Sequence, residues 1–478
     1  RRQRVMLPVF FRHSVHAAQP RARCGTNWWR VGFHAWPWRR ANASSVAAAT
    51  LIDPLRREGL AAKLLGSGLL RGGSEISKEA SEATRVRRVL LSSLPCPLEL
   101  LERLMARPKE VPMPAAAAGQ LVSALEAFFK GLKSPVIDVP VPIAGEDPKV
   151  VIVGDTHGQL LDVLHIFQTH GPPSDSVVYV FNGDIADRGP YACEIFLLLA
   201  AFKLRFPDSV HILRGNHENA QMNARSFRMG GGFYEECLEK YGSRVKEDFR
   251  RLFMVLPLFA VVGEEVFVVH GGLFRTPSAS LTRLRAMPPA TWRRSYPDPK
   301  RHLEWTEEEQ IIFDAQWADP HDGLGSLPSQ RGGPAVTFGS DVTQRFLDEA
   351  GLALCIRSHR PPDTLRGYEL KHNGRLMTIF SASDYGSVVG NRGAVALLRS
   401  KGTGGAGEQV LPRPCTECCS EPRVVAHDPG ADDFDPPLAP ALVDEPPPPL
   451  RKLRLTVVEH DLLRGLVDAP ERPLHMEF

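Results

Sequence analysis

Three stretches of the chain share one pattern, a short run of apolar and mostly β-branched residues that ends in polar residues and glycine. They read KVVIVGDTHGQ from Lys149, VVYVFNGDIADRGP from Val177 and VHILRGNHEN from Val210. Apolar residues at nearly every position of so short a run predict a strand that is buried on both faces. Parallel strands carry their ligands at their carboxyl ends, so we expect the three polar clusters to converge on one site.

The segments LLDVLHIFQTH and YACEIFLLLAAFKLRF, which separate the three runs, predict helices. Strand and helix therefore alternate, which indicates parallel strands joined by right-handed crossovers and an α/β fold. Farther along, FAVVGEEVFVVHGG predicts a hairpin that turns at Gly263–Glu264 and ends in His270. The segments ALCIRSH, GRLMTIFSASDYG and GAVALL predict three more strands.

Composition divides the 478 residues into four segments. Residues 1–50 hold nine Arg and no Asp or Glu, which indicates a leader that is disordered or directs targeting to an organelle. Residues 51–134 predict helices that either pack on the main domain or bind a regulatory protein. Residues 135–400 form the main domain, which carries the clusters. Residues 401–478 are rich in Gly, Pro and acidic residues, so we expect a largely disordered tail, a second place for a regulatory protein to bind.

Charge and cysteine content narrow the class of protein. A net charge of +3 is too small to indicate nucleic-acid binding. The chain has no run of about 18 apolar residues, so we expect no membrane-spanning helix. Five of the eight cysteines are scattered, which predicts buried free thiols and not the disulfide framework of a secreted protein. The other three form CTECC at 415–419, which is half of a zinc-site spacing. We expect an intracellular protein, cytoplasmic or nuclear, unless residues 1–50 direct it to an organelle.

Six oxygen and nitrogen donors stand at the predicted strand ends. Carboxylate, imidazole and amide groups are ligands for hard or borderline divalent metals. Six of them, with one carboxylate shared, suit two metal ions about 3.5–4 Å apart, which is the composition of a two-metal hydrolase. Two such ions can share a hydroxide, lower its pKa and hold an anionic substrate. The predicted ligands are Asp155, His157, Asp184, Asn216, His270 and His359.

Arginines near the clusters indicate that the substrate carries a phosphoryl group, because the guanidinium fork matches phosphate oxygens. Arg188 in DIADRG and Arg331 in a Gly-rich loop are predicted to bind phosphate, whereas Arg214 is predicted to form a structural salt bridge. Breaking a phosphate ester requires a proton for the leaving oxygen, and His217, held by Asp187, is predicted to supply it. The chain has neither a GxSxG motif nor a P-loop, so we expect direct attack by a dimetal-bound hydroxide without a phosphoenzyme.

The motifs GDTHGQ, GDIADRG, RGNHE, HGGLF and IRSH occur in this order, and they resemble the phosphoprotein phosphatase family of protein serine/threonine phosphatases. The resemblance covers about residues 147–398. FNGD, FKLRFPD and FGSDVTQRFLDEAGL are similar to the branch that contains protein phosphatase 5 and the EF-hand phosphatases, although TPR repeats and EF-hand loops are not evident in the sequence. The resemblance implies a metallophosphoesterase-type β-sandwich of two mixed sheets flanked by helices. It also implies hydrolysis of phosphoserine and phosphothreonine in phosphoprotein substrates.

The same resemblance implies a role for each site residue. One metal would be held by Asp155, His157 and Asp184, with Asp184 bridging to a second metal that Asn216, His270 and His359 complete. The substrate phosphate would contact Arg188, Asn216, His217 and Arg331, and Tyr385 in SASDYG would lie near the substrate. His217 with Asp187 would be the acid pair. Family metals are usually manganese, iron or zinc, and we expect manganese here.

The chain departs from the family pattern around the expected substrate groove. An insertion lies in QMNARSFRMGGGF, which also has Gly231 in place of a Tyr. The segment of residues 280–315 is longer than usual. Where the family has LWSDP and SAPNYC, this chain has QWADP and SASDYGS. These changes bear on substrate choice and toxin sensitivity and leave the predicted metal ligands intact. Two alternatives stay open: another dimetal phosphoesterase, such as a dinucleoside polyphosphate hydrolase, and an inactive scaffold that keeps the fold.

Overall fold

Two six-stranded sheets form the centre of the structure, a computed structural model that describes residues 94–385, 390–402, 450–461 and 476–477. The first sheet contains, in spatial order, β15 (Met476–Glu477), β14 (Leu453–His460), β13 (Gly393–Ser400), β2 (Lys149–Val153), β3 (Val177–Phe181) and β4 (Val210–Ile212). The second contains β1 (Val136–Val139), β5 (Phe259–Val262), β6 (Val266–Val269), β10 (Leu354–Arg357), β12 (Leu376–Ile379) and β11 (Tyr368–Lys371). Both sheets mix parallel and antiparallel pairs, so the predicted sandwich of two mixed sheets is confirmed.

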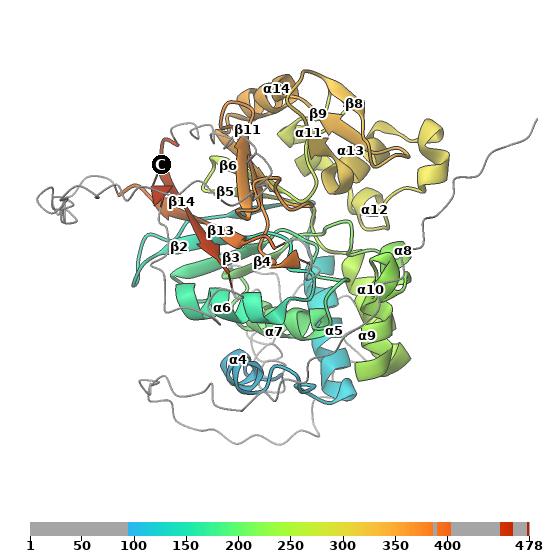
Figure 1. Cartoon of the computed structure of the whole chain (residues 1–478), viewed down its shortest axis with the longest axis vertical. Helices are drawn as coiled ribbons and strands as arrows, with labels where there is room; N and C mark the ends of the chain where they lie inside the picture. Colours follow the sequence, from blue (N-terminus) through green and yellow to red (C-terminus); the bar gives the residue numbers. More distant parts are fainter. Residues whose placement is uncertain (1–93, 386–389, 403–449, 462–475, 478) are drawn as a thin grey trace, which may run out of the picture. The chain divides into compact units, whose positions relative to one another are not determined.

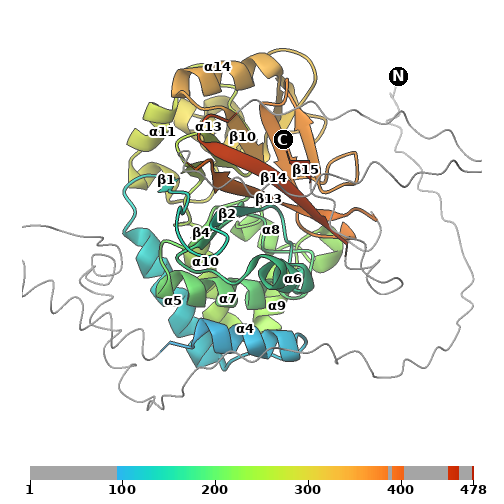
Figure 2. The same cartoon turned by 90° about the vertical axis from the view of Figure 1, so that its left-hand side faces the viewer.

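The unbroken apolar runs of the sequence are explained by two separate cores on either side of each strand. In β2, Val150 and Ile152 pack between the two sheets, whereas Val151 and Val153 pack against helices on the outer face. Successive side chains of a strand point to opposite faces, so a strand covered on both sides needs apolar residues at every position. Figures 1 and 2 show this layering, with helices below the first sheet.

The predicted strand–helix alternation is present in the first sheet. Strands β2, β3 and β4 are parallel, and α6 (Leu160–His170) and α7 (Ala192–Arg205) connect them. Every residue of α7 except the last is buried, because this helix lies between the sheet and an outer layer of helices. The carboxyl ends of the three strands consequently lie at one edge, as the sequence predicts.

The outer layer on this side includes helices from the predicted N-terminal segment. Helix α4 (Pro97–Ala106) contacts α6 and α7, and α5 (Ala115–Lys130) contacts α7 and α10 (Gly242–Phe253). Leu121, Leu125 and Phe129 of α5 are buried in the same core as the outer face of β2. Residues 51–93 of that segment, the leader at 1–50 and the CTECC cysteines lie outside the described residues. Helix α9 (Phe233–Lys240) contacts α7 and α10 in this layer, and α8 (Ala220–Asn223) and the 3₁₀ turn η1 (Phe227–Met229) precede it in the chain.

The second sheet contains the predicted hairpin. Strands β5 and β6 are antiparallel and turn at Gly263–Glu264, so that prediction is confirmed. Strand β10 is parallel to both β6 and β12, which brings the ends of β6 and β10 side by side. The outer face of this sheet is covered by α11 (Leu281–Ala286), α12 (Pro289–Trp292), α13 (Glu307–Trp317) and α14 (Ser340–Ala350), with the 3₁₀ turn η2 (Pro299–Glu304) nearby.

A third, small sheet was not anticipated from the sequence. It contains β7 (Asp319–Pro320), β9 (Val336–Phe338) and β8 (Ser326–Pro328), in this order. Its strands are two or three residues long, β8 is exposed and β7 and β9 are only partly buried, so they lack the apolar run that marks the other strands. None of the helices in the described ranges is long and apolar enough to cross a membrane.

Strand β14 requires a correction to the predicted domain boundary at residue 400. It lies inside the segment predicted as a disordered tail, yet it pairs along its whole length with β13, from Gly393 opposite His460 to Ser400 opposite Leu453. Leu453, Leu455 and Val457 are buried between the two sheets. The strand escaped notice because an acidic, Pro-rich stretch separates it from the rest of the domain in the sequence.

The buried carboxylate of Glu265 anchors the start of β14. Its two oxygens accept hydrogen bonds from the backbone N–H groups of Arg451, Lys452 and Leu453, at distances of 2.8 to 3.1 Å. At the same end, Lys401 N donates to Lys452 O at 2.7 Å. Residues 402 and 450 therefore leave the sheet close to each other, and β13 and β14 form a hairpin.

We expect a chain that ends at residue 402 to lose at least about 3 kcal/mol of unfolding free energy, because it gives up the buried side chains of β14. Urea denaturation followed by circular dichroism measures this. The control replaces residues 403–449 by four Gly and Ser residues and keeps β14. Since closure entropy changes slowly with loop length, the control should be as stable as the full chain. Equal loss of stability in both variants would contradict the assigned role of the strand.

Candidate metal centre and phosphate site

The ends of β2, β3, β4, β6 and β10 bring the six predicted ligands into one buried cluster. The possible metal-binding atoms form two groups, and within each group they lie within 4.8 Å of one another. One group belongs to His157, Asp184 and His217, and the other to Asp184, His270 and His359. Asp184 is common to both groups, as a bridging carboxylate would be. Asp155 joins the cluster through its Oδ2 atom, which lies 3.8 Å from His157 Nε2.

Backbone carbonyl groups fix the orientation of two of the imidazole rings. His157 Nδ1 donates to Ala186 O at 2.9 Å, and His270 Nδ1 donates to Asn182 O at 2.8 Å. The Nε2 atoms therefore face inward, at 3.5 Å (His157) and 3.3 Å (His270) from Asp184 Oδ2. A metal-ligating His commonly uses one ring nitrogen in this way so that the other is free to bind the ion.

The second half of the cluster is completed by Asn216 and His359. The amide end of Asn216 lies 3.0 Å from both His270 Nε2 and His359 Nδ1. Two buried atoms that could bind a metal, Asp155 Oδ2 and His359 Nε2, have no hydrogen-bond partner within the described part of the chain. A buried polar atom without a partner is costly, and two bound cations, one at each atom, would remove that cost. The donor set therefore fits metal ions.

The electrostatics of the cluster agree with metal binding at every ligand with a shifted pKa except His270, whose pKa burial lowers but Asp184 raises more, to about 9. Burial and the neighbouring Asp184 raise the pKa of Asp155 to about 7, so the two carboxylates oppose each other's ionisation. Burial opposes the ionisation of Asp184 too, yet the rings of His270 and His217 hold its pKa well below the usual range. Burial lowers the pKa of His157 and His359 far below that of a free imidazole, which keeps both in the neutral form that binds metals.

Backbone strain accompanies these positions. Among the site residues, five non-glycine residues adopt positive φ angles: His157 (41°), Asp184 (49°), Asp187 (68°), Arg188 (67°) and His359 (77°). Residues other than glycine reach this region at a cost of about 1–3 kcal/mol, and they persist where the surroundings hold them. The backbone bends sharply at these residues, so their side chains fold back over the ends of the strands.

His217 and Asp187 meet as predicted. His217 Nδ1 lies 2.8 Å from Asp187 Oδ2, and both residues are buried. Asp187 is itself held by Asn223 Nδ2 at 2.9 Å and by the backbone N–H of Phe233 at 3.0 Å. Each oxygen of the carboxylate is thus engaged, so the imidazole has one defined orientation.

Arg188 and Tyr385 also lie at the cluster. The ring of Tyr385 stacks on His157 with centroids 5.3 Å apart, and the Arg188 guanidinium lies 5.4 Å from the centre of that ring. Arg188 is exposed, and its backbone N–H donates to Gly231 O at 3.0 Å. A Cβ atom at Gly231 would come within 2.3 Å of Arg225 O, so the unusual Gly at this position allows the loop to close on Arg188.

Arg331 approaches the centre from the second sheet's side. Its Nε donates to Asp319 Oδ2 at 2.6 Å, and the other oxygen of Asp319 accepts from the buried Arg357 at 2.8 Å. After burial, Arg331 is the largest influence that lowers the pKa of His359, which places its charge close to the cluster. All eleven predicted site residues are therefore brought to one region of the molecule.

Comparison with known proteins agrees with this geometry. Residues 148–363 match the model of the calcineurin-like phosphoesterase family. A protein serine/threonine phosphatase from Saccharomyces cerevisiae with similarity to human phosphatase PP5 superposes with a TM-score of 0.55 at 31% identity, covering 63% of this chain and 88% of that one. The chain belongs to the calcineurin-like phosphoesterases, and within them to the phosphoprotein phosphatase family.

Curated relatives agree with this family. The chain is 40% identical over 277 residues to serine/threonine-protein phosphatase 5 from Solanum lycopersicum, covering 58% of this chain and 45% of that protein. It is 39% identical over 254 residues to the protein of that name from Homo sapiens, covering 53% of this chain and 47% of the human protein. The chain thus spans about half the length of these relatives.

The candidate site contains a buried residue that sequence reasoning missed. Glu218 follows His217, and its carboxylate accepts four backbone N–H groups, from Asp184, Ile185, Ala186 and Gly215, at 2.8 to 3.0 Å. Burial, with Asp184 adding to it, raises the pKa of Glu218 to about 7. Its position in RGNHE directly beside the predicted acid was the available signal. Glu218 fixes the loop after β3 to the loop after β4.

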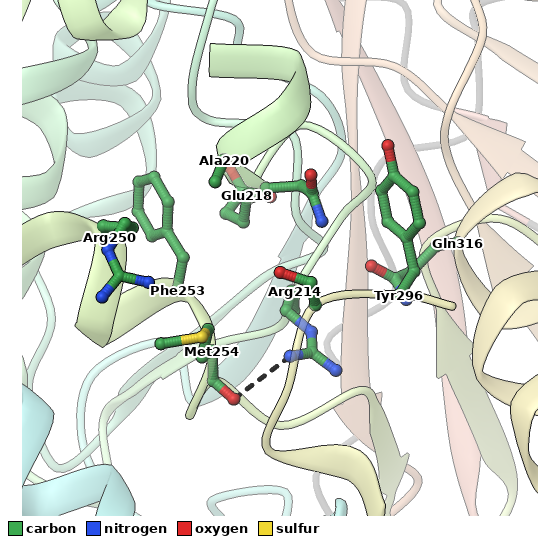
Figure 3. A pocket seen from close by; sticks show the side chains of 10 residues that line it. Arg214, Glu218, Ala220, Arg250, Phe253, Met254, Tyr296 and Gln316 are labelled. Atoms are coloured by element: carbon green, nitrogen blue, oxygen red, sulfur yellow. Dashed lines mark hydrogen bonds between the residues drawn. The ribbon is translucent and has the colours of Figure 1, made fainter. Parts of the chain in front are cut away.

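Arg214, predicted to form a salt bridge, instead binds carbonyl groups. Its guanidinium donates to Met254 O (3.1 Å), Arg294 O (2.9 Å) and Trp292 O (2.8 Å). Arg214 and Glu218 both line a small cavity of about 10 Å³. Figure 3 shows the hydrogen bond from Arg214 to Met254 O. Burial lowers the pKa of Arg214 to about 10. Its role is structural, as predicted. It connects α10 and the segment after α12 to the end of β4 through hydrogen bonds to carbonyl groups, and not through the predicted salt bridge to a carboxylate.

We expect Glu218→Gln to weaken both the fold and metal binding. The amide keeps one acceptor oxygen and turns an NH₂ group toward backbone N–H donors, which costs about 1–3 kcal/mol. Urea denaturation measures the loss, and calorimetric titration with Mn²⁺ should show weaker binding because Asp184 shifts. The matched control is Glu236→Gln, whose buried carboxylate accepts the N–H groups of Ala192 and Cys193 away from the site. That variant should lose stability and keep its Mn²⁺ affinity.

Proposed function

We propose that this chain is a metal-dependent protein serine/threonine phosphatase that hydrolyses phosphoserine and phosphothreonine esters. The observation that carries the proposal is a buried set of six donors with two unpartnered donor atoms, next to a fixed His–Asp pair and two arginines. Family membership supports the same chemistry. The substrates would be phosphoproteins, and residues 51–134 or the tail would bind any regulatory protein.

Asp155, His157 and Asp184 would hold one metal ion, and Asn216, His270 and His359 would complete a second site that shares Asp184. Manganese is the expected metal, with iron or zinc as alternatives that the same donors accept. When bound, the two ions would supply an activated water and neutralise charge on the phosphoryl group. The protein's own contribution is to shield the ligand atoms from water, to keep the ligand side chains uncharged or in ion pairs, and to point them toward the centre of the cluster.

The remaining groups act on the substrate. Arg188 and Arg331 would bind phosphate oxygens, with Asn216 and His217 beside them, and the ring of Tyr385 would close one side of the site. His217 would give its proton to the leaving alkoxide of serine or threonine, since Asp187 occupies Nδ1 and leaves Nε2 for the substrate. Asp187 would keep the ring oriented without contacting the substrate.

His217→Asn should lower kcat on a phosphothreonine peptide by about 10²–10⁴-fold, which is the usual contribution of a general acid. Asp187→Asn should lower it by a smaller factor, because the acid remains but loses its fixed orientation. Stopped or continuous phosphate-release assays measure both, with circular dichroism to confirm folding. The control is His302→Asn, an exposed histidine of η2. Near-normal turnover in His217→Asn would reject the assigned role.

Removing metal should abolish activity without unfolding the protein. Dialysis against a chelator, followed by Mn²⁺, should restore turnover, and elemental analysis should find two metal ions per chain. Asp184→Asn should bind at least one ion fewer. The substrate class is decided by comparing a phosphothreonine peptide with a dinucleoside polyphosphate: preference for the dinucleotide would favour another dimetal phosphoesterase. Activity on neither compound, nor on p-nitrophenyl phosphate, would point to a scaffold.

A further inference from the structure

A groove of about 750 Å³ opens beside Arg331, between the small third sheet and the loop after β10. Strands β8 and β9 form one side of it, near α13 and α14 in Figure 1. Arg360 and Pro361 form the other side. Because Arg331 is one of the two proposed phosphate-binding arginines, a peptide whose phosphorylated residue enters the site has this groove directly beside it.

The charge of the groove is positive where it meets a substrate. Asp319 is the one carboxylate among the described residues that line it, and both of its oxygens are engaged by Arg331 and Arg357. Arg357 is buried behind the groove, so Asp319 is compensated from within the protein. The groove-facing charges that remain are Arg331 and Arg360, with His321 between the strands and the loop.

Arg360 has a partner that a ligand can replace. It forms an ion pair of 2.6 Å with Asp363, three residues along, and the two side chains are 42% and 64% exposed. Ion pairs this exposed contribute about 0–1 kcal/mol, so exchanging Asp363 for another carboxylate costs little. Arg331 has further N–H groups for a ligand, since within the described part of the chain its side chain donates a hydrogen bond only through Nε, to Asp319.

The groove also has an apolar wall. Leu327 is half exposed on β8, and Pro328 and Pro361 line the groove with it. An extended peptide backbone with mixed side chains suits such a surface, whereas a free phosphate or a nucleotide would use only its charged part. Together, the length, charge and apolar wall favour a peptide segment that carries acidic side chains.

We propose that this groove selects phosphoprotein substrates that have acidic residues close to the phosphorylated residue, with Arg360 as the specificity-determining side chain. The proposal rests on the proposed phosphatase function and adds the substrate class. Arg360 would contact a carboxylate of the substrate and would take no part in the chemical step. Gln330, exposed on the loop that precedes Arg331, lines the same groove and offers an independent position for changing its charge.

The test compares phosphothreonine peptides flanked by Ala, by Glu or by Lys, on the N-terminal or the C-terminal side, with the Mn²⁺-loaded full chain. Acidic residues on at least one side should raise kcat/KM about threefold to tenfold over Ala, and Lys should lower it, as expected of partly exposed charge pairs. The preference should weaken at high salt, which screens exposed charges. Equal kcat/KM for all peptides would overturn the proposal.

Variants locate the preference. Arg360→Glu and Gln330→Glu should each reduce or reverse it, and Gln330→Lys should increase it, while hydrolysis of p-nitrophenyl phosphate stays unchanged. The matched control is Arg301→Glu, because Arg301 also forms an exposed ion pair with a carboxylate three residues along, Glu304, outside the groove. An unaltered preference in both Arg360→Glu and Gln330→Glu would overturn the assignment to this groove.

Binding separates this proposal from the proposed function. Fluorescence anisotropy with non-hydrolysable phosphonate versions of the Glu-flanked and Lys-flanked peptides measures recognition without turnover. Tighter binding of the Glu-flanked analogue, lost in Arg360→Glu, would support the groove even if the chain hydrolysed no peptide, an outcome that would refute only the phosphatase function. Turnover of all peptides without any difference in binding would refute only the groove.

Discussion

Asp184 holds the site together through its backbone as well as its side chain. Its carbonyl oxygen accepts hydrogen bonds from the N–H groups of Thr156 and His157, in the loop after β2. Its N–H donates to Glu218 and its Oδ1 accepts from the N–H of His217, both in the loop after β4. One residue therefore fixes three strand-end loops relative to one another. The same carboxylate lies between His157 and His270, so the loops cannot shift without moving the donors.

This arrangement concentrates buried charge, which is unfavourable by itself. Asp155 and Asp184 oppose each other's ionisation, and two donor atoms lack partners in the described part of the protein. An unpaired buried charge costs several kcal/mol, and strained backbone adds to that cost. The two-layered core, with strands buried on both faces, is what offsets these terms. Divalent cations would remove much of the penalty, so metal binding and folding stability should be coupled.

The sequence predicted the features that have strong periodic or chemical signals. Buried runs such as that of β2 identified the central strands, and ligand-type residues at their ends identified the cluster. Features that depend on long-range contact were missed. Strand β14 belongs to the sheet only because β13 is there to receive it, and the short strands of the third sheet are set by their pairing. Glu218 was missed, and the partners of Arg214 were predicted wrongly, because both residues bind backbone groups of distant loops that no local pattern reveals.

Asp319 marks the boundary between side chains that the protein core holds in place and exposed side chains at the rim of the groove. Arg357, which is buried and also donates to Gly271 O and Ala318 O, fixes one of its oxygens, and Arg331 takes the other. The position of Arg331 is therefore determined from inside the core. Leu327 and Gln330, on the same groove, are exposed and have no such tie. Substitutions there can change which peptide is bound without moving a metal donor, whereas a change at Asp319 would disturb both. The departure from the family pattern around 225–232 also lies at the rim, where Gly231 O accepts the backbone N–H of the exposed Arg188, so we expect it to bear on substrate choice more than on hydrolysis.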